Sequence, residues 1–237
     1  MLSNGAVFLH GYGVRGYIWA PLQSAFNNEL GPVATPDLEA ESITDLLNKA
    51  KARIRRQSLE CDAPVLVLGH SLGAVIAAVA ARDLGPEVVS HAVLIAPPFG
   101  DRDYLPGPIL QFLLKHRLVP PALLRPRFFS KHTPPRIRRS VFRSAVRESP
   151  GIQALTFERR WFHSAFFPVP LVQPTLVVAS PGDRIVPVSQ SVEFAKVLGA
   201  TTHVMELEPA VAHDDYFAST EVAASVAGAV LAFLRTS

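Results

Sequence analysis

The most constraining feature of the sequence is a serine between two glycines, Ser71 in the pentapeptide G-H-S-L-G at 69–73. An apolar run at 64–68 precedes it and predicts a buried strand, and a run of small residues at 74–81 follows it and predicts a closely packed helix. Glycines let the backbone turn sharply between the two and raise the serine hydroxyl toward a substrate. The pattern makes Ser71 a candidate nucleophile, although a serine at such a turn can also be a simple helix cap.

Strand and helix patterns alternate along most of the remaining chain. Short apolar runs predict strands at 6–9, 33–37, 91–96, 174–179 and 202–207. Helical patterns stand between them at 16–28, 42–58, 188–198 and 220–234. This alternation predicts an α/β fold whose mainly parallel sheet is covered by helices on both faces.

One segment, 99–173, interrupts the alternation. It holds 10 of the 21 prolines and several short helical stretches, such as 109–118 and 135–148. At 237 residues and 49% hydrophobic composition, the chain can bury one sizeable core. We therefore predict a single domain whose core is formed by 1–98 and 174–237, with 99–173 inserted as a helical lid.

Composition narrows the cellular setting and the classes of partner. Cys61 is the single cysteine, so the fold needs no internal disulfide and no oxidising compartment. The sequence opens without the basic and apolar regions of a signal peptide, and no uncharged apolar run reaches the about 20 residues of a membrane span. The net charge is +3, but no nucleic-acid-binding motif accompanies it. We predict a cytoplasmic protein that spans no membrane and binds no nucleic acid.

The residues with catalytic chemistry follow predicted strands. Active groups gather at the carboxyl ends of a parallel sheet, and Ser71, Asp183 and His213 each lie just after a predicted strand. A serine hydroxyl becomes a good nucleophile when a histidine takes its proton and a carboxylate orients the histidine. Asp214 and Asp215 directly follow the histidine and are alternative carboxylate partners. Asp183 follows a glycine, so it can also be an ordinary turn residue.

Two further histidines lie near the predicted site. His10 ends the strand at 6–9 and His70 precedes the serine, but no carboxylate or cysteine accompanies them at the spacing of metal ligands. We therefore predict no metal and no other cofactor. His10 is expected to form a hydrogen bond with the loop that carries Tyr12, and His70 is expected to be a neighbour that shapes the turn at the serine.

Four motifs in a fixed order give the chain a family resemblance. They are H-G-Y-G at 10–13, G-H-S-L-G at 69–73, G-D-R-I-V-P at 182–187, and the histidine at 213. With these motifs the sequence resembles the α/β-hydrolase family over nearly its whole length. Because the first predicted strand matches the third strand of the family, we expect six strands without the family's N-terminal hairpin. The strand at 33–37 is then expected at the edge of the sheet.

The resemblance implies a role for each motif residue. Ser71 would be the nucleophile, His213 the general base and then acid, and Asp183 the residue that orients the imidazole. The backbone N–H groups of Tyr12 and Leu72 would form the oxyanion hole. Together they imply a serine esterase that cleaves small-molecule carboxylic esters through an acyl-enzyme without a cofactor. A thioesterase, a lipase and a carbon–carbon bond hydrolase are alternatives on the same fold, and a non-catalytic binding module is another.

The segment 99–173 is rich in aromatic residues, holding 11 of the 20 in the chain. Among them are Phe128, Trp161 and Phe162. Ligand sites are mostly apolar concavities, so these side chains can line a pocket for an acyl group. They can equally form the core of the segment itself.

The same segment is strongly basic, with 13 Lys and Arg against four acids. Arg136, Arg138 and Arg139 form its densest cluster. An anionic substrate or partner, an anionic membrane surface, or pairing with the acidic remainder of the chain would each explain this charge. The segment is also similar to the lids of the carboxylesterases that cleave the methyl ester of pimeloyl-acyl carrier protein. That weaker resemblance implies an acyl carrier protein as a partner.

Overall fold

The computed structural model describes residues 2–100, 112, 121–158, 167–199, 201–208 and 210–237. Its centre is a six-stranded sheet in the order β2-β1-β3-β4-β5-β6, in which every pair of neighbours is parallel. The strands are β1 (Ala6–Leu9), β2 (Val33–Ala34), β3 (Val65–His70), β4 (Val89–Ile95), β5 (Thr175–Ala179) and β6 (Thr202–Glu206). The predicted parallel six-stranded α/β sheet, with the 33–37 strand at its edge, is confirmed.

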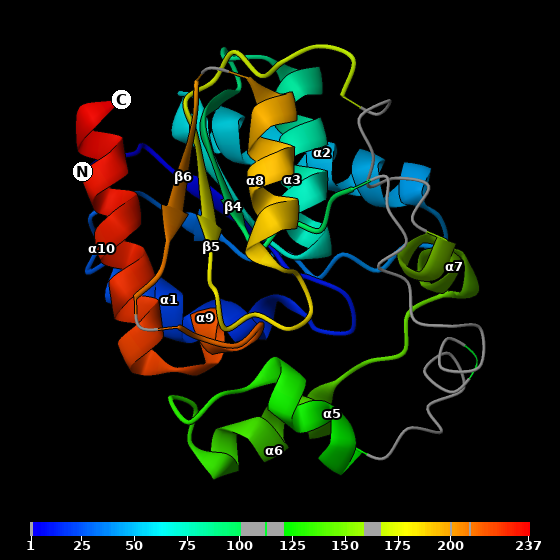
Figure 1. Cartoon of the computed structure of the whole chain (residues 1–237). Helices are drawn as coiled ribbons and strands as arrows, with labels where there is room; N and C mark the ends of the chain where they lie inside the picture. Colours follow the sequence, from blue (N-terminus) through cyan, green and yellow to red (C-terminus); the bar gives the residue numbers. More distant parts are fainter. Residues whose placement is uncertain (1, 101–111, 113–120, 159–166, 200, 209) are drawn as a thin grey trace.

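Helices cover both faces of the sheet (Figure 1). On one face lie α2 (Ile43–Cys61), α3 (Leu72–Leu84) and α8 (Val188–Leu198). On the other face lie α1 (Ala20–Ala25), α9 (Asp215–Ala218) and α10 (Thr220–Thr236), with the short 3-10 helix η1 (Gly16–Trp19) before α1. Within the described ranges, no helix combines the length and the apolar character that crossing a bilayer would require.

The central strands are apolar because they are covered on both faces. All side chains of β1, β3 and β5 are buried, as continuous apolar runs in parallel sheets predict. The edge strands differ: β6 is largely exposed, and β2 has two residues instead of the predicted five. Pro36 lacks the N–H group that a longer strand would use there, which accounts for the early end of β2.

The described part of 99–173 contains three helices, α5 (Pro121–Phe128), α6 (Pro135–Ser144) and α7 (Pro150–Glu158). In Figure 1, α5 and α6 lie beyond the carboxyl ends of the strands. The helix predicted over 135–148 ends four residues early, because the chain becomes extended at Ala145 and runs along the loop after β1. The helix predicted over 109–118 lies outside the described residues, and the division into core and lid stays a prediction.

The two glycines of G-H-S-L-G are required by close backbone approach. A Cβ on Gly73 would collide with the carbonyl oxygens of Leu9 and His10, and a Cβ on Gly69 would collide with the carbonyl oxygen of Gly73. The first turn of α3 therefore lies directly against the end of β1. This contact brings the loop after β1 next to the loop after β3.

We expect Gly73→Ala to destabilise the fold by about 2 kcal/mol, the usual scale for an overpacked core, because neither backbone segment can retreat. Thermal unfolding measures the effect. Gly228→Ala in α10 is the matched control, because no atom lies within 4 Å of a Cβ placed there. It should stabilise the helix by up to about 1 kcal/mol. Equal melting temperatures for the two variants would contradict the tight contact at Gly73.

Candidate functional site

Ser71 occupies the turn between β3 and α3 in a strained backbone conformation. Its φ of 54° and ψ of −123° are rare for a residue with a side chain. The turn is held by a hydrogen bond from Ser71 N to the carbonyl oxygen of Ile95, at 2.9 Å. The serine side chain is partly exposed and does not cap α3. The conformation therefore favours the nucleophile interpretation over the helix-cap interpretation.

His213 and Asp183 form a buried hydrogen-bonded pair. The distance from His213 Nδ1 to Asp183 Oδ2 is 2.7 Å. The other carboxylate oxygen of Asp183 accepts hydrogen bonds from the backbone N–H groups of Ile185 at 2.8 Å and Val186 at 2.9 Å. The loop after β5 thus fixes the carboxylate, and the carboxylate holds the imidazole through Nδ1, so Nε2 takes no part in this bond.

The two aspartates after His213 have other surroundings. The carboxylate of Asp215 accepts hydrogen bonds from the backbone of Ala212 and Ser130 and from the hydroxyl of Thr133, so it joins the histidine loop to the turn between α5 and α6. Burial raises the pKa of Asp214 to about 7, although the positive charge that His213 can carry opposes this rise. Among the three candidate carboxylates, the structure therefore brings Asp183 to the imidazole nitrogen.

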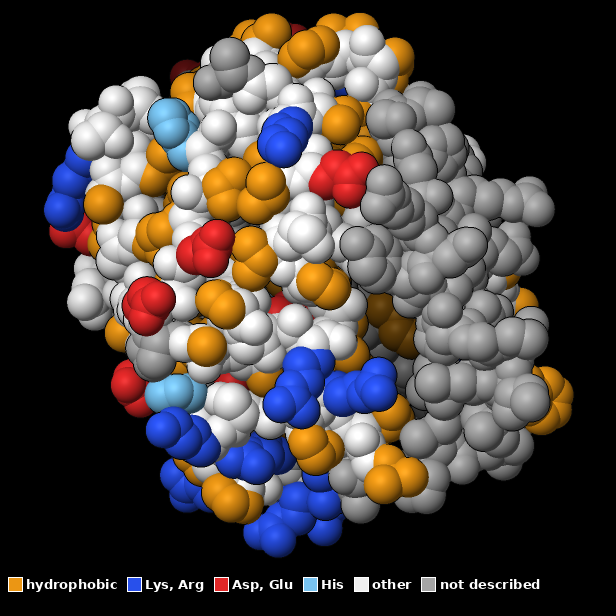
Figure 2. Space-filling model, viewed as in Figure 1, with side chains coloured by type: hydrophobic (Ala, Val, Ile, Leu, Met, Phe, Trp, Pro, Cys, Tyr) orange, Lys and Arg blue, Asp and Glu red, His pale blue; other side chains and the backbone are white. Residues whose placement is uncertain are grey.

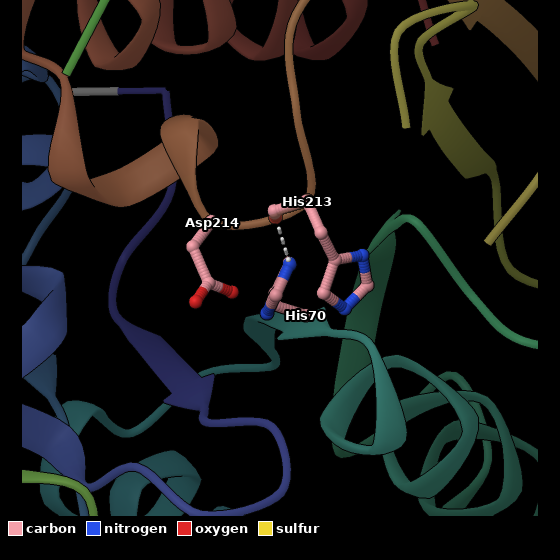
Figure 3. Close-up of side chains that lie close together, drawn as sticks. All are labelled: His70, His213 and Asp214. Atoms are coloured by element: carbon pink, nitrogen blue, oxygen red, sulfur yellow. Dashed lines mark hydrogen bonds between the residues drawn. The ribbon is translucent and has the colours of Figure 1, made fainter. Parts of the chain in front are cut away.

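The ring of His70 forms a hydrogen bond with the backbone of His213 (Figure 3). Its Nε2 donates to the carbonyl oxygen of His213 at 2.8 Å, and the two ring centroids are 4.6 Å apart. Burial, together with the neighbouring His213, holds the pKa of His70 well below its usual range. His70 is thus a neutral side chain whose observed hydrogen bond is to the backbone of His213. Its predicted role in shaping the turn at the serine stays a prediction.

The three side chains in Figure 3 are the described group that comes nearest to a metal-ligand set. His70, His213 and Asp214 each have a ligand-type atom within 4.8 Å of the others. However, His70 Nε2 and His213 Nδ1 already form hydrogen bonds, so each ring has one nitrogen left to offer. These hydrogen bonds suit a proton-transfer site, in which one imidazole nitrogen is anchored and the other is available.

The pKa of His213 reflects two opposing effects. Burial lowers it, but the carboxylates of Asp183 and Asp214 raise it by more, so the net pKa lies above the ordinary value of 6.5. Among the described residues, Ser71 Oγ forms no hydrogen bond with His213. Such bonds are often long in free enzymes and shorten when substrate binds.

The loop after β1 lies against the serine. A Cβ on Gly11 would be 3.2 Å from the Cβ of Ser71. His10 Nδ1 donates to the carbonyl oxygen of Gly11, and His10 Nε2 accepts from the backbone N–H of Leu38, both at 2.9 Å. Burial lowers the pKa of His10, in keeping with a neutral ring in this role. The hydrogen bond predicted between His10 and the Tyr12 loop is confirmed.

A small pocket opens between this loop, the first turn of α3 and the segment after α6. It is lined by both residues whose backbone N–H groups are oxyanion-hole candidates, Tyr12 and Leu72, and by the buried carboxylate of Glu148. The remaining lining residues are His10, Gly11, Leu38, Leu46, Gly73, Ile76 and Ile152. The pocket is therefore mainly apolar, and its lining includes the residue that follows the candidate nucleophile.

The predicted binding residues of 99–173 are only partly described. The Phe128 ring lies 6.1 Å from the His213 ring, and its carbonyl oxygen accepts from the N–H of Asp214 at 2.8 Å. Trp161 and Phe162 lie outside the described residues.

The three predicted arginines lie on α6, where Lys and Arg side chains gather over α5 and α6 (Figure 2). Arg136 and Arg139 are exposed. Arg138 is partly buried, and its Nε donates to the carbonyl oxygen of Thr133 at 2.7 Å. The exposed charge of α6 therefore comes from Arg136, Arg139 and Arg143.

Sequence reasoning did not single out Arg15 and Glu148, which form a buried ion pair of 2.7 Å beside the pocket. One signal was available: Glu148 is the only acid between Asp103 and Glu158, in a segment crowded with cations. Its partner could not be found in the same way, since Arg15 is 133 residues away in the chain.

We expect Asp214→Asn to shift the acid limb of the kcat/KM profile to lower pH. The carboxylate of Asp214 raises the pKa of His213. A general base works only when unprotonated, so removing this charge would let His213, the candidate base, act at lower pH. A pH profile with a small activated ester measures the shift. Glu193→Gln, an exposed carboxylate on α8, should leave the profile unchanged. An unmoved acid limb in Asp214→Asn would contradict this coupling.

Comparisons with known proteins agree with the fold. The sequence matches the model of the alpha/beta hydrolase family over residues 6–224. No curated protein matches the sequence.

Among solved structures, Rv0554 from Mycobacterium tuberculosis is 24% identical, with a TM-score of 0.77 over 98% of this chain and 90% of its own. A thermophilic esterase from Thermogutta terrifontis is 17% identical, with a TM-score of 0.72 over 98% and 89%. The enol-lactonase from Burkholderia xenovorans LB400 is also 17% identical, with a TM-score of 0.74 over 98% and 91%. These structures are similar in fold, and the family match shows that the chain belongs to the alpha/beta hydrolase family.

Proposed function

We propose that this hydrolase-family chain is a serine carboxylesterase whose nucleophile is Ser71. The observation that carries the proposal is the 2.7 Å hydrogen bond between His213 and Asp183, formed at the same end of the sheet as the strained turn that presents the serine. Family membership supports a hydrolase, and the choice of these three residues is ours. The similar structures that are described as an esterase and an enol-lactonase favour a carboxylic ester or lactone as the substrate class.

The proposed reaction has two halves. In the first, His213 Nε2 takes the proton of Ser71 as the serine oxygen attacks the ester carbonyl, and the carbonyl oxygen becomes negatively charged. The backbone N–H groups of Tyr12 and Leu72 would stabilise that charge. The imidazolium, stabilised by Asp183, then gives its proton to the departing alcohol, which leaves an acyl-enzyme. In the second half, water loses its proton to His213 as it attacks the acyl carbon. His213 then returns that proton to the oxygen of Ser71 as the acyl–oxygen bond breaks, which releases the acid and regenerates the serine.

We propose that α5 and α6 belong to a lid over this site. The Phe128 ring against His213 and the position of both helices beyond the carboxyl ends of the strands support this arrangement. The apolar side of α6, with Ile137, Val141 and Phe142, packs toward the core beside α9. The opposite side carries exposed arginines, so the lid would present an apolar surface to the substrate and a basic surface to solvent.

We further propose that the acyl group of the substrate is delivered by an acyl carrier protein. The support for this proposal is the exposed charge of the segment: Arg136, Arg139 and Arg143 form no ion pair within the described part of the chain. Pairing with the acidic remainder of the chain therefore does not account for these arginines. An acidic carrier would find a complementary surface there.

Replacing the nucleophile tests the proposal directly. We expect Ser71→Ala to fold normally and to lose turnover of p-nitrophenyl esters by at least about 10³-fold, because the proposed mechanism forms the acyl-enzyme on the Ser71 hydroxyl. A fluorophosphonate probe should label the wild type and leave Ser71→Ala unlabelled. Ser24→Ala, an exposed serine in α1, is the control and should retain both activity and labelling. Wild-type turnover by Ser71→Ala would exclude the proposed mechanism.

The carrier proposal has its own test. Replacing Arg136, Arg139 and Arg143 with serine should raise KM for a carrier-linked ester on the order of tenfold at low salt and flatten its salt dependence. KM for p-nitrophenyl acetate should not change.

The matched control removes the same charge elsewhere, by replacing the exposed residues Arg55, Lys196 and Arg235 with serine. Equal effects of the two triple variants, or equal effects on both substrates, would argue against docking of a carrier at α6.

A further inference from the structure

A buried carboxylate, Glu148, contacts the backbone of the loop after β1. Its Oε1 accepts a hydrogen bond from the N–H of Gly13 at 2.9 Å and another from Nη1 of Arg15 at 2.7 Å. The side chains of Glu148 and Arg15 are 5% and 10% exposed. An ion pair this buried gains little net stability, because the lost hydration offsets the attraction between the charges. Its clearest effect is to place an acceptor at the Gly13 N–H.

The hydrogen bond from Gly13 belongs to a series that fixes three consecutive peptide groups. The carbonyl oxygen of Gly11 accepts from His10 Nδ1, the N–H of Gly13 donates to Glu148, and the carbonyl oxygen of Gly13 accepts from the N–H of Val146, all at 2.9 Å. The C=O and N–H groups of a trans peptide point in opposite directions. The bond to Gly11 therefore sets the direction of the Tyr12 N–H, and the bond from Gly13 fixes the next peptide group.

We propose that Glu148 is a positioning residue for ester hydrolysis, which holds the loop after β1 so that the Tyr12 N–H points toward the developing oxyanion. This role rests on the proposed function, because it assumes that Tyr12 N–H stabilises the tetrahedral intermediate. Glu148 is buried and lines the same pocket as Tyr12 and Leu72. It acts through Gly13 and does not touch the reacting atoms.

The proposal predicts an effect on kcat more than on KM. An oxyanion donor is used most strongly in the transition state, and a misplaced donor lowers the rate without weakening ground-state binding. Without an acceptor, the buried Gly13 N–H would have to turn toward another partner, and the adjoining Tyr12 peptide would turn with it.

The decisive experiment compares two double variants that differ only in the acceptor. Arg15→Leu/Glu148→Gln removes both charges but keeps an amide oxygen that can accept from Gly13, whereas Arg15→Leu/Glu148→Leu removes the acceptor as well. Replacing a buried ion pair with apolar side chains often preserves or increases stability, so both variants should fold. Circular dichroism and thermal unfolding check this, and kcat and KM for p-nitrophenyl acetate are measured well below both melting temperatures.

We expect the glutamine variant to keep kcat within about threefold of the wild type, and the leucine variant to lose about 10- to 100-fold in kcat with little change in KM. Equal kcat values in the two variants would overturn the role of Glu148, whether both are high or both are low. Ser71→Ala, assayed beside them, separates the two ideas. Turnover by Ser71→Ala would overturn the proposed function and this role with it, whereas an inactive Ser71→Ala beside equal double variants would overturn this role alone.

Discussion

The site depends on one steric constraint, the absence of side chains at Gly69 and Gly73. Because these positions carry no Cβ, α3 begins against the end of β1, and the loop after β1 reaches the turn at Ser71. A larger residue at Gly73 would push α3 away from the end of β1, and one at Gly69 would push against the first turn of α3. The serine, its strained backbone and the backbone N–H of the following residue are all placed by this contact. The geometry of the candidate site therefore depends on backbone packing between α3 and the end of β1.

The candidate base is held at both its ring and its backbone. Asp183 anchors the His213 ring at Nδ1, and His70 donates to the His213 carbonyl oxygen. The residue before the histidine is bound through its N–H by Asp215, and the residue after it is bound through its N–H by Phe128. If His213 accepts the proton, as we propose, a side chain held this firmly would need little reorganisation when the reaction begins. The neighbouring carboxylates also raise its pKa, which strengthens it as a base.

Local sequence patterns were enough to predict most of the fold. The alternating runs predicted five strands besides β3 in the right order. The helical pattern at 42–58 corresponds to α2, which Ser42 caps by accepting a hydrogen bond from Asp45 N at 3.2 Å. The predicted ends were less accurate at β2, where Pro36 lacks an N–H, and at α6, where the chain turns to bind the loop after β1. The candidate triad could be assigned because each member follows a strand, and all such positions meet at one end of a parallel sheet.

The sequence could not reveal the contacts that support the triad. The pair of Arg15 and Glu148 joins positions 133 residues apart, and Asp215 reaches Thr133 across 82 residues. No periodic pattern connects such positions, since they meet only after the sheet and the inserted segment have folded together. The catalytic roles, the lid and the basic docking surface stay predictions, because they concern a reaction and partners beyond the geometry of the chain.

The hydrogen bonds of Asp215 also limit whether α5 and α6 can be replaced by the corresponding segment of a related protein. One carboxylate, two residues after the candidate base, holds the turn between α5 and α6 through Ser130 and Thr133. A second tie, between Val146 and Gly13, fixes the other end of α6 to the loop after β1. The two helices are therefore not an interchangeable module. A graft from a relative would have to bring its own partners for Asp215 and Gly13, or it would disturb the base and the loop in the same step.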